Sequence, residues 1–229
     1  MADMAFVSPP QDGGGSEYKC YVESNKQLYE TFWKGSQHFP DLRGVHLRRV
    51  NLSDEVSTTW LSSNRLGFGS SAVVRTLDED RFPIVKIAHP NTDARQQIQH
   101  EYEIMRSLSH FDGAADVDSE PLKDKDGIFG FRLERLSKID FADLQMRSSE
   151  VRRLVKALHD IGYSHGDLSP SNVMVKGNGR LVLIDFSFSG PVGQRLATHI
   201  PRWVYDGAAY ETTADFRRLD RYFQMTQEM

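Results

Sequence analysis

Two neighbouring stretches of sequence decide the fold of this chain: His165-Gly-Asp-Leu-Ser-Pro-Ser-Asn172, and Leu183-Ile-Asp-Phe-Ser187 shortly after it. They contain two carboxylates, Asp167 and Asp185, and the amide of Asn172. Oxygen atoms of carboxylates and amides are the ligands that Mg²⁺ prefers, and Asn172 and Asp185 are the expected pair. The Asp167 carboxylate is suited to orienting or deprotonating an attacking hydroxyl. The two stretches therefore predict a phosphoryl-transfer site, provided that the chain folds their polar groups together.

A β-hairpin is predicted between the two stretches. The short apolar runs Val173–Val175 and Leu181–Ile184 flank Lys176-Gly-Asn-Gly179, and Gly and Asn tolerate the positive φ values of tight turns. Asn172 precedes the first strand and Asp185 follows the second. An antiparallel hairpin returns the chain to its starting point, so these two side chains are expected to meet.

Composition excludes several classes of protein. The 229 residues suffice for one domain or a small two-lobed unit, with 39% hydrophobic and 26% charged residues. A net charge of −4 gives no support for direct nucleic-acid binding as the main task. The single cysteine, Cys20, cannot form an intrachain disulfide and fits a reducing compartment. With no long apolar run and no signal-peptide pattern, we expect no membrane partner and a cytoplasmic (or nuclear) location.

The N-terminal quarter of the sequence has little periodic pattern. Residues 1–17 contain Pro9-Pro10 and Gly13–Gly15 and are predicted to be a disordered leader. Residues 18–58 form an N-terminal extension, which either packs on the following domain or binds a partner or substrate. Within it, Val45–Val50 resembles a strand. A short helix is predicted with an apolar side made of Leu28, Tyr29, Phe32 and Trp33.

A glycine-rich turn is predicted near residue 69, between two β-prone runs. Its pattern is set by Gly67, Gly69, Ala72 and Val74. Glycines allow the backbone to approach a triphosphate closely, with N–H groups available to its oxygens. A plain hairpin has the same signature. A dinucleotide-binding loop would lead into a helix, and the β-prone residues after the turn exclude it.

Lys86 interrupts an apolar strand and shares one face of it with Ile84 and Ala88. A buried ammonium needs an anionic partner, whereas a lysine on a solvent-facing edge would not. The following helix runs to about Ser109 and carries two candidates. Glu101 is the expected partner of Lys86, and Glu103 is expected to be solvated.

The next strand ends at Glu134-Arg-Leu136, before a Ser/Asp-rich stretch. A chain that leaves a strand at this point would form the hinge between two lobes. Its main-chain N–H and C=O groups, around Glu134 and Leu136, are suited to reading the edge of an adenine.

These motifs follow one another in the order found in protein kinases: the glycine-rich turn, the strand lysine, the helix glutamate, the hinge and the two stretches around Asp167 and Asp185. Residues 60–225 therefore resemble the protein-kinase-like superfamily. His165-Gly-Asp167 is similar to the corresponding motif of aminoglycoside phosphotransferases and of the compact kinase of the KEOPS complex. The resemblance implies ATP and Mg²⁺ as cofactors. Lys86 would hold the α- and β-phosphates, and Asp167 would be the catalytic base. His165 would support the loop structurally, and Asp215 would buttress its backbone.

The resemblance also implies an α+β, two-lobed fold. Residues 59–134 would form an N-lobe with an antiparallel sheet and one helix, and residues 135–229 a reduced, mainly helical C-lobe. Gly166, Ser169 and Ser187 depart from the residues of typical protein kinases, which at these positions are Arg, Lys and Gly. Ser169 in particular removes a cation that helps to neutralise the transferred phosphate.

The expected function is transfer of the ATP γ-phosphate to a hydroxyl of a protein Ser/Thr or a small molecule. The short course of the chain after Asp215 lacks peptide-docking helices and favours a small acceptor or an assembly that supplies the docking surface. Two alternatives stay open: an ATP-binding pseudokinase, and a kinase fold used for nucleotidyl transfer or other metabolite tailoring. The sequence does not predict an oligomeric state.

Overall fold

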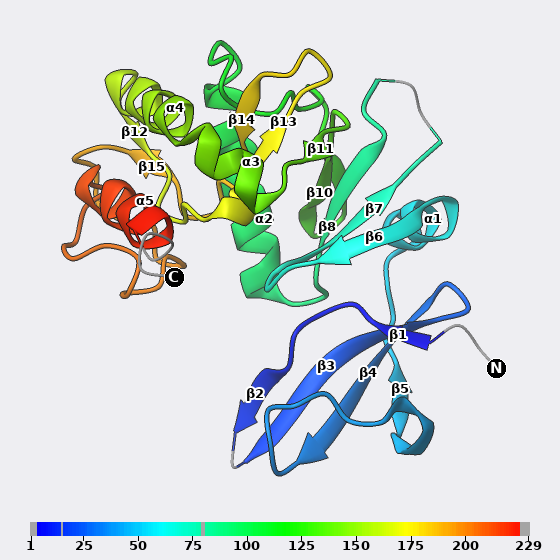
Figure 1. Ribbon diagram of the computed structural model, residues 1–229. Coiled ribbons are helices and arrows are strands. Elements are labelled where there is room, and N and C mark those ends of the chain that lie inside the picture. The colour runs from blue at the N-terminus through cyan, green and yellow to red at the C-terminus, as the bar shows by residue number, and fades with distance from the viewer. Residues whose placement is uncertain (1–3, 15, 79–80, 225–229) are drawn as a thin grey trace. The chain divides into compact units, whose positions relative to one another are not determined.

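In the computed structural model the chain forms two compact units. Its helices and strands are labelled in Figure 1. The structure describes residues 4–14, 16–78 and 81–224. The first unit consists of Met1–Ile98 and Glu120–Arg132, and the second of Gln99–Ser119 and Leu133–Met229. The predicted lobe boundary after residue 134 differs from this division, because residues 99–119 group with the second unit.

The first unit begins with a five-stranded antiparallel sheet, the N-terminal sheet. Its strands are β1 (Met4–Phe6), β2 (Gln11–Gly14), β3 (Glu17–Ser24), β4 (Gln27–Lys34) and β5 (Leu47–Arg49). β3 pairs with β4, and its other edge pairs with β1 and β2. A 3-10 turn, η1 (Leu42–Gly44), precedes β5.

Two predictions for this region are wrong. Of the predicted leader, residues 1–3 and 15 lie outside the described residues, but β1, β2 and the start of β3 are ordered strands. The predicted helix over residues 28–33 is strand β4. A two-residue turn explains the difference, because Asn25 and Lys26 have φ values of 49° and 56° and join β3 to β4 as a tight hairpin. The predicted strand at 45–50 is confirmed as β5.

A second five-stranded sheet follows in the first unit, after helix α1 (Asp54–Ser62). Its strands, in the spatial order β6-β7-β8-β10-β9, are β6 (Asn64–Phe68), β7 (Ala72–Thr76), β8 (Ile84–Ala88), β10 (Gly127–Leu133) and β9 (Leu122–Asp124). Helix α2 (Thr92–Ser107) begins after β8 and is capped by the Asn91 side chain, which accepts from the Ala94 amide at 2.8 Å.

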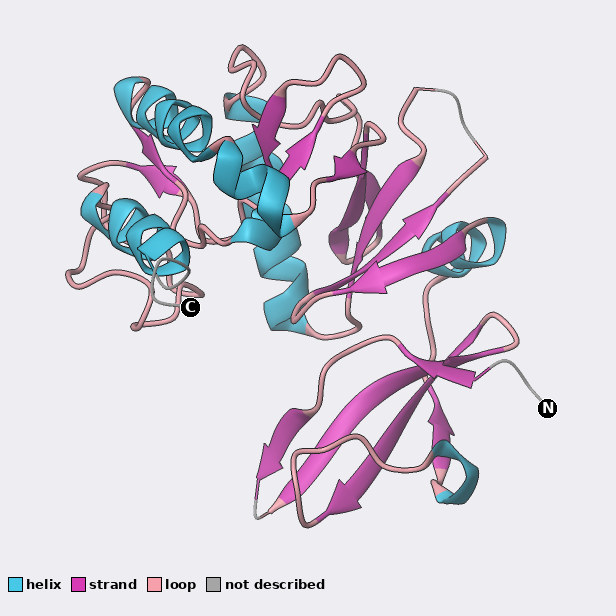
Figure 2. Cartoon of the chain, viewed as in Figure 1, coloured by secondary structure: helices cyan, strands magenta, loops and turns pink. Residues whose placement is uncertain are grey.

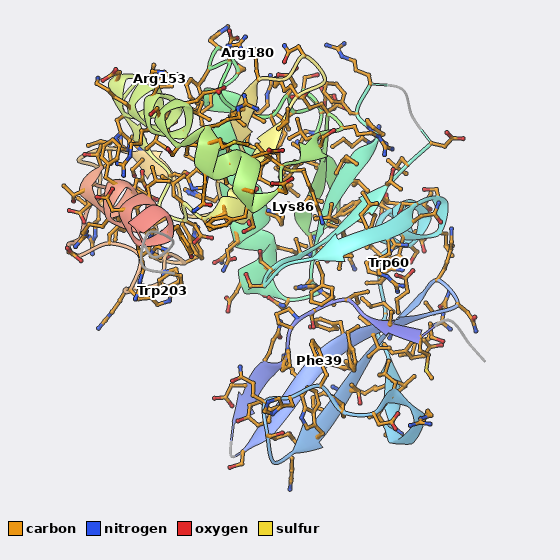
Figure 3. All side chains as sticks on the ribbon, in the orientation of Figure 1. Phe39, Trp60, Lys86, Arg153, Arg180 and Trp203 are labelled. Carbon is orange, nitrogen blue, oxygen red and sulfur yellow. The ribbon has the colours of Figure 1, made fainter. Side chains whose placement is uncertain are left out.

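The two sheets of the first unit share one hydrophobic core. Trp60 of α1, labelled in Figure 3, is 2% exposed and belongs to it. The other buried members come from both sheets and the neighbouring segments: Val7, Tyr21, Leu28, Val56, Val73, Val85, Ile87 and Phe129. Each sheet therefore covers an apolar face that the other would expose to water.

A buried ion pair also joins the two sheets. The guanidinium of Arg75, on β7, is fully buried and donates to both carboxylate oxygens of Glu23, on β3, at 2.9 and 3.0 Å. It also donates to the Ser63 hydroxyl at 2.8 Å and lies 4.1 Å from the centre of the Trp60 ring. This arrangement gives a charged group in a dry interior the partners that it needs.

The second unit combines helices with short strands (Figure 2). Its elements are β11 (Ser137–Lys138), α3 (Phe141–Met146), α4 (Ser148–Asp160), β12 (Tyr163–Ser164), η2 (Pro170–Asn172), β13 (Val173–Val175), β14 (Leu181–Leu183), β15 (Gly190–Pro191) and α5 (Thr213–Gln224). The predicted α+β class is confirmed. No helix in the described ranges combines the length and the apolar character needed to cross a lipid bilayer.

Candidate active site

The predicted glycine-rich turn is a hairpin between β6 and β7. Gly67 lies within β6, Ala72 and Val74 lie in β7, and the Gly69 amide donates to the Ala72 carbonyl at 2.8 Å. The tip of the hairpin, Ser70 and Ser71, lines a polar cavity of about 540 Å³ within the first unit. The other residues lining this cavity come from β2, β3 and the start of α2: Gln11, Asp12, Lys19, Asn91, Thr92, Asp93, Ala94 and Gln97.

Lys86, which is labelled in Figure 3, lies in β8. The antiparallel register pairs it with Val74 of β7. The Lys86 side chain is half-buried, whereas Val85 and Ile87, on the other face of the strand, are fully buried in the core. The predicted alternation of this strand, with Lys86 on the same face as Ile84 and Ala88, is confirmed. Glu101 lies on the part of α2 that belongs to the second unit and is 1% exposed. Its pairing with Lys86 stays a prediction.

The predicted hinge residues follow β10. The Glu134 carboxylate accepts from the Asp116 amide at 2.7 Å and pairs with the Lys176 ammonium at 2.8 Å. Leu136 is half-buried and immediately precedes β11. The Glu134 side chain is therefore committed to the second unit's own structure. Adenine binding was predicted for the main-chain N–H and C=O groups around Glu134 and Leu136. That role stays a prediction.

The predicted hairpin after Asn172 is present. β13 pairs with β14 in antiparallel register, and Gly179, in the connecting turn, has a φ of 83°. The Ile184 amide donates to the Asn172 carbonyl at 3.0 Å. This hydrogen bond holds the end of β14, where Asp185 follows, against the residue that precedes β13.

Asp167 is held by two different side chains. The Asn172 amide nitrogen donates to the Asp167 carbonyl at 2.7 Å and lies 3.4 Å from its Oδ2 atom. The guanidinium of Arg218 lies 3.4 Å from Oδ1. Burial and the negative charge of Asp185 raise the pKa of Asp167 above its ordinary value. A carboxylate with a raised pKa is a stronger proton acceptor, which suits a general base.

Asp185 has a φ of 63°, a left-handed conformation that is rare for residues other than glycine and tends to occur at functional sites. The Ser187 hydroxyl donates to Oδ1 of Asp185 at 2.5 Å and fixes the orientation of the carboxylate. The sequence identified Ser187 only as a departure from the expected glycine. The structure shows that its hydroxyl positions a predicted metal ligand.

The donor set near Asp185 fits Mg²⁺. Asn172 donates to Asp167 through its amide nitrogen, so its side-chain carbonyl oxygen is the atom suited to a cation. The carboxylate of Asp185 is close enough for its charge to act on Asp167. Within the described part of the chain, no group of three or more His, Cys, Asp or Glu side chains could hold a metal ion by itself. Mg²⁺ commonly uses one or two protein carboxylates and completes its shell with phosphate oxygens and water.

His165 is fully buried and supports the loop. Its Nε2 atom lies 3.0 Å from the Ile184 carbonyl, and its ring packs against Phe186 with centroids 4.9 Å apart. Burial lowers the pKa of this imidazole, so the ring is neutral at neutral pH. The Ser189 hydroxyl donates to the His165 carbonyl at 2.9 Å. These contacts agree with the structural role predicted for His165.

Asp215, near the start of α5, buttresses the same loop. Its carboxylate is fully buried and accepts from the amides of His165 and Gly166, each at 2.8 Å. The His159 Nε2 atom lies 2.9 Å from the same carboxylate. The predicted contact between Asp215 and the loop backbone is confirmed.

Glycine at position 166 has a steric cause. The residue has a φ of 79°, and a Cβ atom there would lie 2.4 Å from the Tyr205 hydroxyl and 2.6 Å from the Phe188 carbonyl. The Tyr205 hydroxyl donates to that carbonyl at 2.9 Å, so neither atom can move without breaking a hydrogen bond. No residue with a side chain fits this position without such a rearrangement.

Gly166→Ala is therefore expected to reduce the free energy of unfolding by more than about 2 kcal/mol, since the left-handed conformation alone costs ~1–2 kcal/mol. Urea denaturation measures the change. Gly193→Ala is the matched control, because Gly193 has a φ of 84° and no atom within 4 Å of its Cβ position. If both variants lost the same free energy of unfolding, the close contacts around Gly166 would contribute nothing beyond the cost of the left-handed backbone conformation.

Arg218 is the site residue that sequence reasoning missed. It lies on α5, three residues after Asp215, and positions three apart share a face of a helix. That spacing was the available signal. A basic residue in a helix is far more often a solvated surface residue, so the spacing alone did not distinguish Arg218 from Arg217.

Comparisons with known proteins agree with this geometry. The family model described as choline/ethanolamine kinase matches residues 85–221. The chain is also 27% identical over 166 residues to the ovarian-specific serine/threonine-protein kinase Lok of Drosophila melanogaster. That match covers 62% of this chain and 34% of Lok, so the chain spans about a third of that relative's length.

A similar fold occurs in the structure of the CAK complex from Chaetomium thermophilum bound to ATP-gamma-S. The TM-score is 0.52 at 19% identity, covering 70% of this chain and 59% of the compared chain. At this identity the similarity concerns the fold alone, and it confirms the predicted protein-kinase-like fold. Because the family model covers more than half of the sequence, the chain belongs to the choline/ethanolamine kinase family.

Proposed function

We propose that the chain is a phosphotransferase that uses ATP and Mg²⁺ and delivers the γ-phosphate to a hydroxyl group. The observation that carries the proposal is the cluster of Asp167, Asn172 and Asp185 in the second unit. Asn172 links to Asp167 through two contacts, and the charge of Asp185 acts on Asp167. Three such oxygen-bearing groups, with one carboxylate of raised pKa, match the requirements of phosphoryl transfer.

In this mechanism Asp167 orients the acceptor hydroxyl and receives its proton. The acceptor oxygen forms a bond to the γ-phosphorus as the bond from that phosphorus to the β–γ bridging oxygen breaks, and ADP leaves. Mg²⁺, when held by Asn172 and Asp185, would neutralise charge on the phosphate oxygens. Lys86 and the hairpin around Gly69 would contribute the phosphate contacts of the first unit.

The acceptor that we propose is a small molecule with a hydroxyl group, of the kind for which the choline/ethanolamine kinase family is named. The match to the family model extends over residues 85–221 and is not limited to one short motif, which supports a small-molecule acceptor. A serine or threonine hydroxyl of a protein is the alternative that the similarity to Lok suggests.

The test follows the fate of the nucleotide. The protein is incubated with ATP and Mg²⁺ in the presence of choline, ethanolamine or a serine-containing peptide, and ADP, AMP and the phosphorylated acceptor are measured. ADP together with a phosphorylated acceptor is the expected result. AMP would instead indicate nucleotidyl transfer, and stabilisation by ATP without any turnover would indicate a pseudokinase. No effect of ATP on the melting temperature would exclude the nucleotide-binding roles of Lys86 and Asn172.

Asp185→Asn is expected to lower ADP formation by at least about a hundredfold, because Asp185 would hold the Mg²⁺ that neutralises the charge developing on the phosphate. The additional thermal stabilisation that Mg²⁺ gives over ATP alone should also disappear. Asp112→Asn is the control, since Asp112 is 78% exposed and forms a surface ion pair with Arg180. A variant Asp185→Asn that keeps its Mg²⁺ response would refute the assigned metal ligand.

A further inference from the structure

Arg218 is fixed at the proposed catalytic carboxylate by three contacts within the second unit. Its Nη1 atom lies 3.4 Å from Oδ1 of Asp167, and its Nη2 atom donates to the Val204 carbonyl at 3.5 Å. Its Cζ atom lies 5.3 Å from the centre of the Trp203 ring. Only 22% of the Arg218 side chain is exposed, whereas Trp203 (labelled in Figure 3) is 65% exposed. The guanidinium is therefore a placed group and not a freely moving surface charge.

The Asp167 carboxylate is held on both of its oxygens by different elements. Asn172, on η2, approaches Oδ2, and Arg218, on α5, approaches Oδ1. A planar carboxylate with a partner on each oxygen has little freedom to rotate. Reactions that depend on a hydroxyl aligned with a phosphorus atom lose rate steeply when the orienting group is displaced.

Helix α5 acts twice on the same loop. Asp215, through its carboxylate, fixes the main-chain amides of His165 and Gly166. Arg218, one helical turn later, reaches the side chain of Asp167. The backbone and the reactive side chain of the loop are thus positioned by opposite charges on one face of one helix.

A cation is needed near these carboxylates, and the loop does not provide one. Asp167 and Asp185 repel each other, and phosphoryl transfer brings further negative charge. The Ser169 hydroxyl is hydrogen-bonded to Ser171 at 2.7 Å and carries no charge. Lys176, in the nearby hairpin, is paired with Asp116 and Glu134.

We propose that Arg218 is the positioning residue of the phosphotransfer site: it holds Asp167 in its working orientation and supplies the fixed positive charge that the loop lacks at Ser169. This inference rests on the proposed function. It assigns to α5 a role in the site that the stretch of residues 165–187 does not supply by itself.

The test compares Arg218→Ala, Arg218→Lys and Arg217→Ala by steady-state kinetics. Arg217 is the matched control, because its neighbouring guanidinium is 55% exposed and pairs with Asp206 and Glu211. Arg218→Ala should lower kcat by about 10- to 100-fold and change the KM for ATP by less than about twofold, since the lost interaction acts on orientation and not on nucleotide binding. Arg217→Ala should keep kcat within about twofold of the original.

A rescue experiment separates charge from simple structural support. Arg218→Lys keeps a cation and should recover most of the lost kcat. In the Arg218→Ala background, Ser169→Lys should recover at least about tenfold, because it returns a cation to the loop from a different element. A loss of kcat that neither lysine restores, or an unchanged kcat in Arg218→Ala, would overturn the proposal.

A double-mutant cycle keeps the proposal testable even if the original protein shows no turnover. Melting temperatures are measured for Arg218→Ala, Asp167→Asn, the double variant and the original protein. If the pair forms, the two shifts are not additive, because each substitution removes the same interaction. Additive shifts would show that Arg218 does not hold Asp167, whatever the reaction of the protein is. Absence of turnover with a non-additive cycle would refute the proposed function alone.

Discussion

Asp167→Asn is expected to lower kcat on the order of a thousandfold while leaving the KM for ATP nearly unchanged, since general bases contribute roughly 10²–10⁴ to rate. Asparagine has the size of aspartate and keeps an oxygen for the Asn172 amide, so the loop should retain its shape. It cannot accept the proton of the acceptor hydroxyl at neutral pH. It also removes one of the two negative charges that repel each other at the site.

The measurement is ADP formation in the steady state, together with the thermal stabilisation of the variant by ATP and Mg²⁺. Asp160→Asn is a matched control, because Asp160 is 62% exposed and forms a surface pair with Lys156. That variant should behave like the original protein. If Asp167→Asn retained more than about a tenth of the original kcat, proton transfer to Asp167 would not be part of the mechanism.

Glu23→Ala is expected to reduce the free energy of unfolding by about 3–5 kcal/mol, because it leaves the Arg75 guanidinium charged and without its anion in a dry interior. Arg75 has no exposed side-chain surface, and two of its five polar contacts end on the Glu23 carboxylate. The remaining partners, the Ser63 hydroxyl and two main-chain carbonyls, are neutral and cannot compensate the charge.

Urea denaturation followed by circular dichroism gives the change in stability. Glu30→Ala is the control, because Glu30 pairs with an Arg48 side chain that is 63% exposed and remains hydrated, so its loss should cost much less stability than Glu23→Ala. The double variant Glu23→Leu, Arg75→Met removes both charges and should recover much of the loss, as apolar replacements of buried ion pairs often do. If Glu23→Ala and Glu30→Ala reduced the free energy of unfolding equally, the Arg75 guanidinium would have to be hydrated once Glu23 is removed, and the predicted cost of an unpaired buried charge would be wrong.

The catalytic half of the fold was predictable because its signals are local. The hairpin between Asn172 and Asp185 follows from two short apolar runs and a Gly/Asn turn, and the structure contains it. The face of β8 that carries Lys86 follows from simple alternation. The predicted protein-kinase-like fold is confirmed, and the match to the choline/ethanolamine kinase family model begins within that strand.

The N-terminal sheet was not predictable in the same way. The β3–β4 hairpin has Lys26 at a turn position where glycine is the strongest signal, so only Asn25 indicated the turn. The spacing of Leu28, Phe32 and Trp33 then fits a helix as well as a strand. The ion pair of Glu23 with Arg75 joins residues 52 positions apart, a distance over which no local pattern operates. The contact of Arg218 with Asp167, 51 positions apart, was hidden for the same reason.

The core shared by the two sheets of the first unit does not respect the boundary of the family match. The match to the family model begins at residue 85, inside β8. Val85 and Ile87 of this strand belong to the same core as Trp60 and Val73. A segment cut at that boundary would carry Val85 and Ile87 with their apolar face bare. The segment that matches the family model is therefore smaller than the segment needed to complete the hydrophobic core. Residues 4–49, which form the N-terminal sheet, belong to that larger segment.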